Sequence, residues 1–174
     1  MQRIWRIVLI SAAVVAAVAA TGLGMAYSLG AFAEPGRFGA VPGCSVLTPE
    51  MFAPVVTTAK VEADGDNCTA SDGQVQVNVG YTLVRKQARV GGPELAGRYL
   101  DVVAGSGGEK LDGVGEQAIR QRTQAIGAPQ VISMRVSNLI VVLSVVNLGG
   151  GDLPPGAEGG LVKLATALGA RLGA

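Results

Sequence analysis

The feature that most constrains this chain is an uncharged stretch of 27 residues, numbers 7 to 33, near its N-terminus. A helix of about 20 apolar residues crosses the roughly 30 Å of hydrocarbon in a bilayer, so this stretch is long enough to span one. Arg3 and Arg6 precede it, and no acidic residue occurs before Glu34. Because basic residues beside an apolar helix tend to stay in the cytoplasm, we expect residues 1–6 to be a cytoplasmic stub and residues 7–33 a transmembrane anchor.

A cleaved signal peptide is the second interpretation of the same stretch. Ala31, Phe32 and Ala33 form the small-x-small pattern that a signal peptidase accepts, directly before Glu34. Against cleavage, the apolar region is about twice the 7–15 residues usual in a signal peptide. We therefore favour an uncleaved signal anchor. Both interpretations send residues 34–174 across the membrane to the extracytoplasmic side, and the anchor predicts a single-pass protein of the cell membrane.

Small residues recur at every fourth position of the apolar stretch, at Ala12, Ala16, Ala20 and Gly24. Small side chains at this spacing let a second membrane helix approach closely. They predict a helix-packing face for a membrane-protein partner, in addition to contact with the lipid bilayer. A stretch this rich in alanine also produces such a spacing by chance, so the sequence leaves the partner open.

The residues that follow divide into a tether and one domain. Residues 34–43 hold Pro35, Pro42 and three glycines, a composition typical of a short, extended, mobile tether. Residues 44–174 have the length of a single ordinary domain. Beyond Ala33 the chain carries twelve basic and thirteen acidic residues, a formal charge of −1. This balance argues against nucleic acid or a polybasic membrane-binding surface as the main partner.

Cys44 and Cys68 are the only cysteines of the chain. In an oxidising extracytoplasmic compartment, two cysteines in a small domain most simply form one disulfide. A redox-active pair is the alternative. Cysteines this far apart in sequence are more often a structural link, so we favour the structural disulfide.

Hydrophobic patterning predicts an α+β domain. Apolar and polar residues alternate from Val75 to Leu83, which indicates a strand with one buried face, and Asp72-Gly73 before it is a hairpin signal. Residues 139–146 are apolar on both faces, which is typical of a central strand. Together with the other strand signals, these segments predict a mainly antiparallel sheet of about five strands packed with three helices, preceded by one N-terminal transmembrane helix.

The three helices are expected after Thr48, after Pro93 and before the C-terminus. Thr48 and Pro49 suit a helix start, although Pro54 keeps that helix short. In the second helix, the spacing of the apolar residues predicts a core-facing stripe, made of Leu95, Tyr99, Val102 and Val103. The final helix offers a leucine-rich stripe of the same kind.

The residues that could carry chemistry are few. The chain has no histidine, which excludes histidine-dependent catalytic triads and the common zinc sites. We expect no enzyme activity, no cofactor and no metal. One loop could recognise a ligand, because its glycines bring the backbone near the surface; its residues are Asp112, Gly113, Gly115 and Glu116. A turn that directs the next strand into the sheet is the simpler interpretation.

Several short segments resemble an actinobacterial family of membrane-anchored or lipoprotein-type extracytoplasmic domains of unknown function. The segments are Cys44–Glu50, Cys68 before a hairpin, Leu111–Ala118, the strands near 134–145 and the closing Leu/Ala helix. The resemblance implies a cell-envelope location, a disulfide between the two cysteines and an α+β domain, and it supplies no catalytic residues. This chain departs from the pattern in lacking a lipobox cysteine and in having Pro54 within the first helix.

Two functions are compatible with these observations. The first is a non-catalytic accessory or structural subunit, held by its membrane helix beside a larger membrane complex. The second is an extracytoplasmic module that binds a lipid or cell-wall ligand in an apolar pocket between sheet and helices. The face of the strand from Val75 to Leu83 distinguishes them, because a binding module of this kind needs that face open.

Overall fold

The computed structural model describes residues 30–57, 60–122 and 127–174. Most of the predicted transmembrane anchor, including Ala12, Ala16, Ala20 and Gly24, lies outside the described residues. Within the described ranges, no helix is both long enough and apolar enough to cross a membrane.

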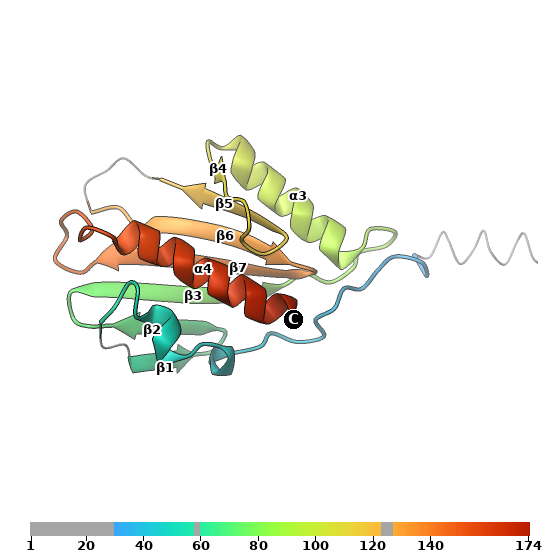
Figure 1. Ribbon diagram of the computed structural model, residues 1–174. Helices are drawn as coiled ribbons and strands as arrows, with labels where there is room; N and C mark the ends of the chain where they lie inside the picture. Colours follow the sequence, from blue (N-terminus) through green and yellow to red (C-terminus); the bar gives the residue numbers. More distant parts are fainter. Residues whose placement is uncertain (1–29, 58–59, 123–126) are drawn as a thin grey trace, which may run out of the picture.

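One antiparallel sheet forms the centre of the domain, in the strand order β1-β2-β3-β7-β6-β5-β4 (Figure 1). Across the three described ranges it has seven strands: β1 (Lys60–Asp64), β2 (Asn67–Ser71), β3 (Val75–Leu83), β4 (Glu109–Lys110), β5 (Gln117–Gln121), β6 (Gln130–Val136) and β7 (Leu139–Asn147). The long strands β3 and β7 pair along their full length, from Val75 opposite Asn147 to Leu83 opposite Leu139. The predicted α+β class and antiparallel sheet are confirmed.

The expected number of about five strands is too low for the part of the chain that the structure describes. Both additional strands, β1 and β4, lie at the edges of the sheet and are exposed along most of their length. Hydrophobic patterning detects burial, and an edge strand that faces water gives no such pattern. Residues 111–116 form the loop between β4 and β5.

The described ranges contain three α-helices, as predicted: α2 (Pro49–Phe52), α3 (Gly92–Gly105) and α4 (Ala157–Gly173). A short 3-10 turn, η1 (Cys44–Val46), precedes α2. Pro49 takes the first position of α2 as expected, but Thr48 makes no side-chain hydrogen bond to cap it. The helix α2 has only four residues, which agrees with the short helix expected from Pro54.

The main core lies between α4 and one face of the sheet. Figure 1 shows α4 running along this face, over β6 and β7. Every second residue of β3 from Val75 to Tyr81 is buried there, as the alternation predicts. The helix contributes a buried stripe, which comprises Leu161, Leu164, Ala165, Leu168 and Leu172. Each such large apolar side chain contributes about 1.5–3 kcal/mol on burial.

The helix α3 packs on β5, β6 and β7 from the opposite face, where Ile119 and Ile140 are buried. The predicted core stripe of this helix is wrong. Ala96 and Leu100 face the sheet, whereas Tyr99 is 49% exposed and Val102 is 74% exposed. Close packing at the start of the helix fixes this rotation: a Cβ on Gly92 would come within 2.6 Å of the carbonyl oxygens of Pro35 and Val84.

The disulfide between Cys44 and Cys68 is confirmed, with the two Cα atoms 5.6 Å apart. It joins η1 to β2, and Cys68 is completely buried in the main core. The start of the domain is thereby fixed to the sheet, which brings the segment before it close to the remainder of the fold.

Candidate functional site

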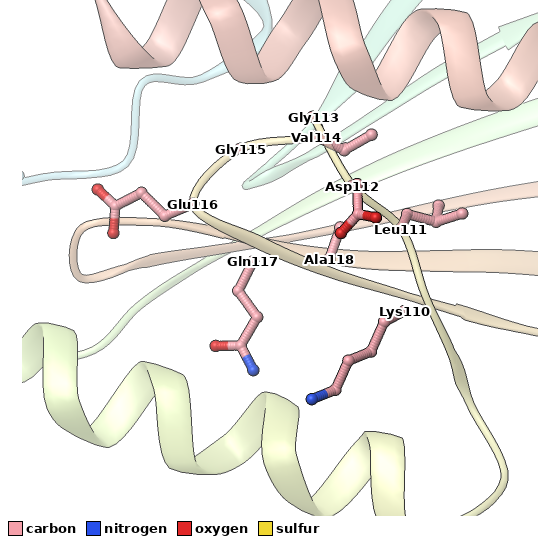
Figure 2. A pocket seen from close by; sticks show the side chains of 9 residues that line it. All are labelled: Lys110, Leu111, Asp112, Gly113, Val114, Gly115, Glu116, Gln117 and Ala118. Atoms are coloured by element: carbon pink, nitrogen blue, oxygen red, sulfur yellow. The ribbon is translucent and has the colours of Figure 1, made fainter.

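The predicted recognition loop packs closely between α4 and the sheet. Val114 is buried in the main core and points toward α4, whereas Lys110 and Gln117 point toward α3 (Figure 2). The loop lines an open depression of about 300 Å³. Asp112 and Gly113 are exposed at its rim. Val114 is therefore part of the packed structure, whereas Gly115 and Glu116 are exposed like the two residues of the rim.

Gly115 owes its identity to this packing. Its φ is +57°, and a Cβ there would come within 2.7 Å of the carbonyl oxygen of Arg135. On the other side, a Cβ on Gly169 of α4 would come within 2.7 Å of the Gly115 nitrogen. Two glycines thus let the loop, the helix and β6 meet backbone to backbone.

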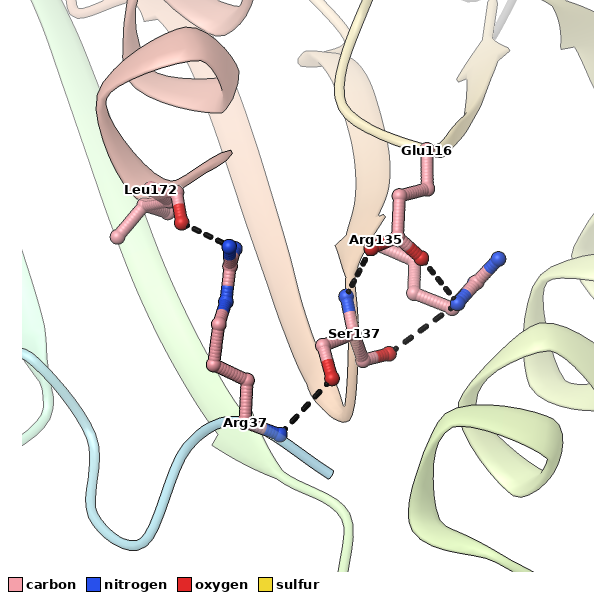
Figure 3. A network of polar contacts seen from close by, with 5 residues as sticks. All are labelled: Arg37, Glu116, Arg135, Ser137 and Leu172. Atoms are coloured by element: carbon pink, nitrogen blue, oxygen red, sulfur yellow. Dashed lines mark hydrogen bonds and ion pairs between the residues drawn. The ribbon is translucent and has the colours of Figure 1, made fainter. Parts of the chain in front are cut away.

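Glu116 uses both of its carboxylate oxygens within the fold, as Figure 3 shows. Oε2 accepts a hydrogen bond from Nη1 of Arg135 at 2.5 Å, and Oε1 accepts one from the backbone N–H of Ser137 at 2.9 Å. Ser137 has a φ of +53°, so this carboxylate holds a turn that a non-glycine residue rarely adopts. Gly115 and Glu116 therefore have structural roles, and recognition by the exposed rim stays a prediction.

Arg37 joins the expected tether to the end of α4. Its guanidinium donates to the carbonyl oxygen of Leu172, as Figure 3 shows. It also donates to the carbonyl oxygen of Gly173 at 3.0 Å. Its backbone N–H donates to Oγ of Ser137 at 3.0 Å. A cation suits the carbonyl end of a helix because the helix dipole is negative there. The side chain also lines an open depression of about 260 Å³ beside Glu116.

Asn138, which is only 1% exposed, binds Phe38, the residue that follows Arg37 in the tether. Its Oδ1 accepts from the N–H of Phe38 at 2.9 Å, and its Nδ2 donates to the carbonyl oxygens of Phe38 at 3.0 Å and Val84 at 3.1 Å. A Cβ on Gly36 would come within 2.2 Å of Cγ of Asn138. Residues 34–43 were expected to be a mobile tether, but their central part is hydrogen-bonded and closely packed against the domain.

The first described residue also touches the domain. A tight turn follows β3, in which Gln87 and Val90 exchange backbone hydrogen bonds of 3.0 and 2.9 Å. We call residues 85–90 the basic hairpin, because Arg85, Lys86 and Arg89 are exposed on it. A Cβ on Gly30 would come within 1.6 Å of the carbonyl oxygen of Ala88, so the chain leaves the described domain in contact with this hairpin.

A third depression, of about 520 Å³, lies between the tether and the end of β3. Tyr81 lines it together with Asp66 and Arg85. The hydroxyl of Tyr81 is buried and has no hydrogen-bond partner, and burial raises its pKa to about 12. An acidic and a basic side chain therefore face this depression beside a neutral phenol.

The sequence did not reveal the two residues that fix the tether, Arg37 and Asn138. Ser137 and Asn138 carry a turn signal, and this signal correctly predicts the hairpin between β6 and β7. It says nothing about a partner one hundred residues away. No local pattern at Arg37 predicts that it caps the last helix, because the two meet only in the folded domain.

The described residues include no group of three or more His, Cys, Asp or Glu side chains that could hold a metal ion. Comparison with known proteins gives no relative from which a role could be transferred: no family model, no curated protein and no solved structure matches the chain. The function must therefore be argued from the geometry of the residues themselves.

Proposed function

We propose that this chain is a non-catalytic, membrane-anchored cell-envelope protein that serves as an accessory or structural subunit beside a larger membrane complex. The observation that carries this proposal is the docking of residues 34–38 onto the domain through Asn138. The segment follows directly on the uncharged stretch 7–33. A helix anchored in the membrane would thus be joined to the domain without a free linker.

A docked junction supports a structural role for a physical reason. A flexible linker lets a domain sample many orientations relative to its anchor, whereas a hydrogen-bonded junction restricts it to few. A subunit that contacts a partner both within the membrane and outside it needs such a fixed orientation. The resemblance to membrane-anchored extracytoplasmic domains agrees with this location.

The alternative, a binding module with an apolar pocket between sheet and helices, loses the site it requires. The apolar face of β3 is buried against the rest of the main core, from Val75 to Tyr81. No other observation favours a lipid or cell-wall ligand in that position. An enzyme is supported less well, because the chain has no histidine and the carboxylate of Glu116 is bound within the fold to Arg135.

The first test is the intact mass of the protein extracted from membranes of cells that express the full chain. A retained N-terminus supports the anchor, and a chain beginning at Glu34 would overturn it. Co-purification in mild detergent then asks whether a membrane protein accompanies it.

Leucine substitutions locate the face that holds the partner. The triple variant Ala16→Leu, Ala20→Leu, Gly24→Leu should abolish co-purification, because bulky side chains keep a second helix at a distance. As a matched control, Val14→Leu, Val18→Leu and Gly22→Leu fall on the opposite side of an ideal helix and should leave it unchanged. Equal behaviour of the two triple variants would remove the helix-packing face from the proposal.

A further inference from the structure

We infer that the basic hairpin is a headgroup-binding surface, which holds the domain against an anionic lipid bilayer beside its own anchor. This inference rests on the proposed membrane anchoring and adds a second contact between the domain and the membrane. The position of the hairpin, its charge and its shape carry the argument.

The position follows from the way in which the chain enters the domain. Figure 1 shows the turn between β3 and α3 at the same end of the domain as the first described residues. Gly30 packs on Ala88 of the hairpin, and Nζ of Lys86 donates to the carbonyl oxygen of Gly30 at 3.5 Å. Residues 7–29, which precede this contact, carry no charge. An anchor that ends here therefore places the hairpin at the membrane surface.

The charge of the hairpin complements an anionic surface. Arg85, Lys86 and Arg89 lie within five residues, and no acidic residue occurs between Asp72 and Glu94 in the sequence. In the fold, Asp66 lines a depression with Arg85, and Glu34 packs against Gly91. Three basic residues thus stand against two acidic ones at this end. Each basic residue close to an anionic membrane contributes about 1 kcal/mol of attraction. The domain as a whole is nearly neutral, so this cluster is a local feature that the net charge conceals.

The neighbouring side chains suit the same interface. Phe32 is 65% exposed in the turn that joins Gly30 to Ala33, and aromatic rings favour the headgroup region of a bilayer. The backbone hydrogen bonds between Gln87 and Val90 keep the hairpin compact. Such a turn loses little conformational freedom when it binds.

The opposite end of the sheet offers an internal reference. Lys60 lies opposite Ser71 of β2, which lies opposite Gln76, near the end of β3 away from Leu83. Lys60 is exposed and pairs with Glu62 at 3.2 Å. Arg122 follows β5 at the same end and contacts Glu158 at 3.7 Å. These basic residues lie away from the entry of the chain at Gly30, so a membrane held by the hairpin should not reach them.

The test compares the acetylation rates of Lys86 and Lys60 within the same full-length protein. The chain is reconstituted in vesicles of phosphatidylcholine alone or of equimolar phosphatidylcholine and phosphatidylglycerol, and modification is read by peptide mass spectrometry. In the anionic vesicles, at low salt, Lys86 should react at least tenfold more slowly than in phosphatidylcholine, on the order expected from two or more basic contacts. Lys60 should react at the same rate in both kinds of vesicle. Molar salt should restore the acetylation rate of Lys86 in the anionic vesicles, because salt at this concentration screens charges beyond about 3 Å.

Two matched variants sharpen the result. Arg85→Gln should reduce the lipid-dependent protection of Lys86 about fivefold, the equivalent of one basic contact. Arg122→Gln makes the same change of charge at the far end of the sheet and should have no effect. Equal reaction of Lys86 in both kinds of vesicle would overturn the inference.

The remaining outcomes separate this inference from the proposed function. Protection by inorganic phosphate in phosphatidylcholine vesicles would indicate an anion site and overturn the membrane contact. Protection only when a co-purified acidic protein is present would likewise overturn it. A chain that stays in the vesicles after an alkaline wash, with Lys86 unprotected, contradicts the inference alone. A chain released by that wash contradicts the anchor itself.

Discussion

The side chain of Asn138 pairs with the backbone of Phe38 as a neighbouring strand would, accepting from its N–H at 2.9 Å and donating to its carbonyl oxygen at 3.0 Å. The two residues are one hundred positions apart. This pairing joins the segment that leaves the apolar stretch to the central hairpin of the sheet. It converts a sequence with the composition of a linker into part of the domain.

Replacement of Asn138 should therefore release the segment. Asn138→Ala leaves three backbone groups without their buried partner, which costs about 2–4 kcal/mol in the free energy of unfolding. Chemical denaturation of the full chain in detergent measures this loss. Trypsin should also cleave after Arg37 faster in the variant, because the segment is no longer held. Asn78→Ala, on the side of β3 away from the main core, serves as the control. Unchanged cleavage at Arg37 would contradict the proposed role of Asn138.

Glu116 should contribute to stability through the turn between β6 and β7. Glu116→Ala removes the acceptor of both Arg135 and the Ser137 N–H, and we expect a loss of about 1–2 kcal/mol, since the carboxylate is partly exposed. Asp112→Ala, in the exposed rim of the same loop, should change stability by less than about 0.5 kcal/mol. The two denaturation midpoints provide the comparison. If both variants match the parent protein, Glu116 does not support the turn.

The contact between Gly169 and Gly115 predicts opposite effects for one substitution at two positions of α4. Gly169→Ala should destabilise the domain despite the higher helix propensity of alanine, because its Cβ would collide with the loop. Gly159→Ala meets nothing within 4 Å and should be neutral or stabilising by up to about 1 kcal/mol. Thermal unfolding, followed by circular dichroism, measures whether each variant is less or more stable than the parent protein. Two stabilised variants would show that the loop and helix are not in close contact.

Removal of the disulfide should lower stability through the unfolded chain. The two cysteines are 24 positions apart, and the loop-closure model gives about 3–4 kcal/mol for a link of this length. The variant Cys44→Ala, Cys68→Ala should unfold at correspondingly lower denaturant. Reductant should shift the midpoint of the parent protein and leave that of the variant unchanged. A parent protein insensitive to reductant in partly denaturing conditions would contradict this contribution.

Tyr81 should make stability depend on alkaline pH. Burial raises the pKa of its hydroxyl to about 12, whereas a tyrosine in an unfolded chain ionises near pH 10. The unfolded state therefore loses its proton first, and stability falls as the pH rises from about 10 to 12. By linkage, the loss reaches about 1.4 kcal/mol at pH 11. Tyr81→Phe should remove this part of the pH dependence, and denaturation curves at pH 9 and 11 measure it. Parallel losses in both proteins would show that Tyr81 ionises normally.

Much of the fold could be predicted from the spacing of apolar residues, because this spacing indicates which side chains of a strand or helix are buried. The alternation from Val75 to Leu83 correctly gave a strand with one buried face, and the leucines of the final helix face the core as expected. The rotation of α3 could not be predicted in this way. Its apolar residues offer more than one stripe, and close packing of Gly92 against Pro35 and Val84 selects the one that contains Leu100.

The candidate site was less accessible to sequence reasoning. The loop that holds Gly115 and Glu116 was identified together with its simpler interpretation as a turn, and the contacts of both residues now support that interpretation. The partners of Glu116 were not foreseeable, because a carboxylate in a loop is compatible with solvent, a ligand or a buried donor. Only the approach of Ser137 and Arg135 decides among them.

The sequence by itself determined which segments the protein contains. These are an uncharged stretch long enough to span a membrane, a pair of cysteines, and strands and helices whose spacing of apolar residues requires burial. These properties are local, because they depend on residues a few positions apart. The tertiary structure decided how the parts are joined. It docked residues 34–38 onto Asn138 and brought the basic hairpin against Gly30, since hydrogen bonds and close contacts between distant segments arise only when the chain has folded.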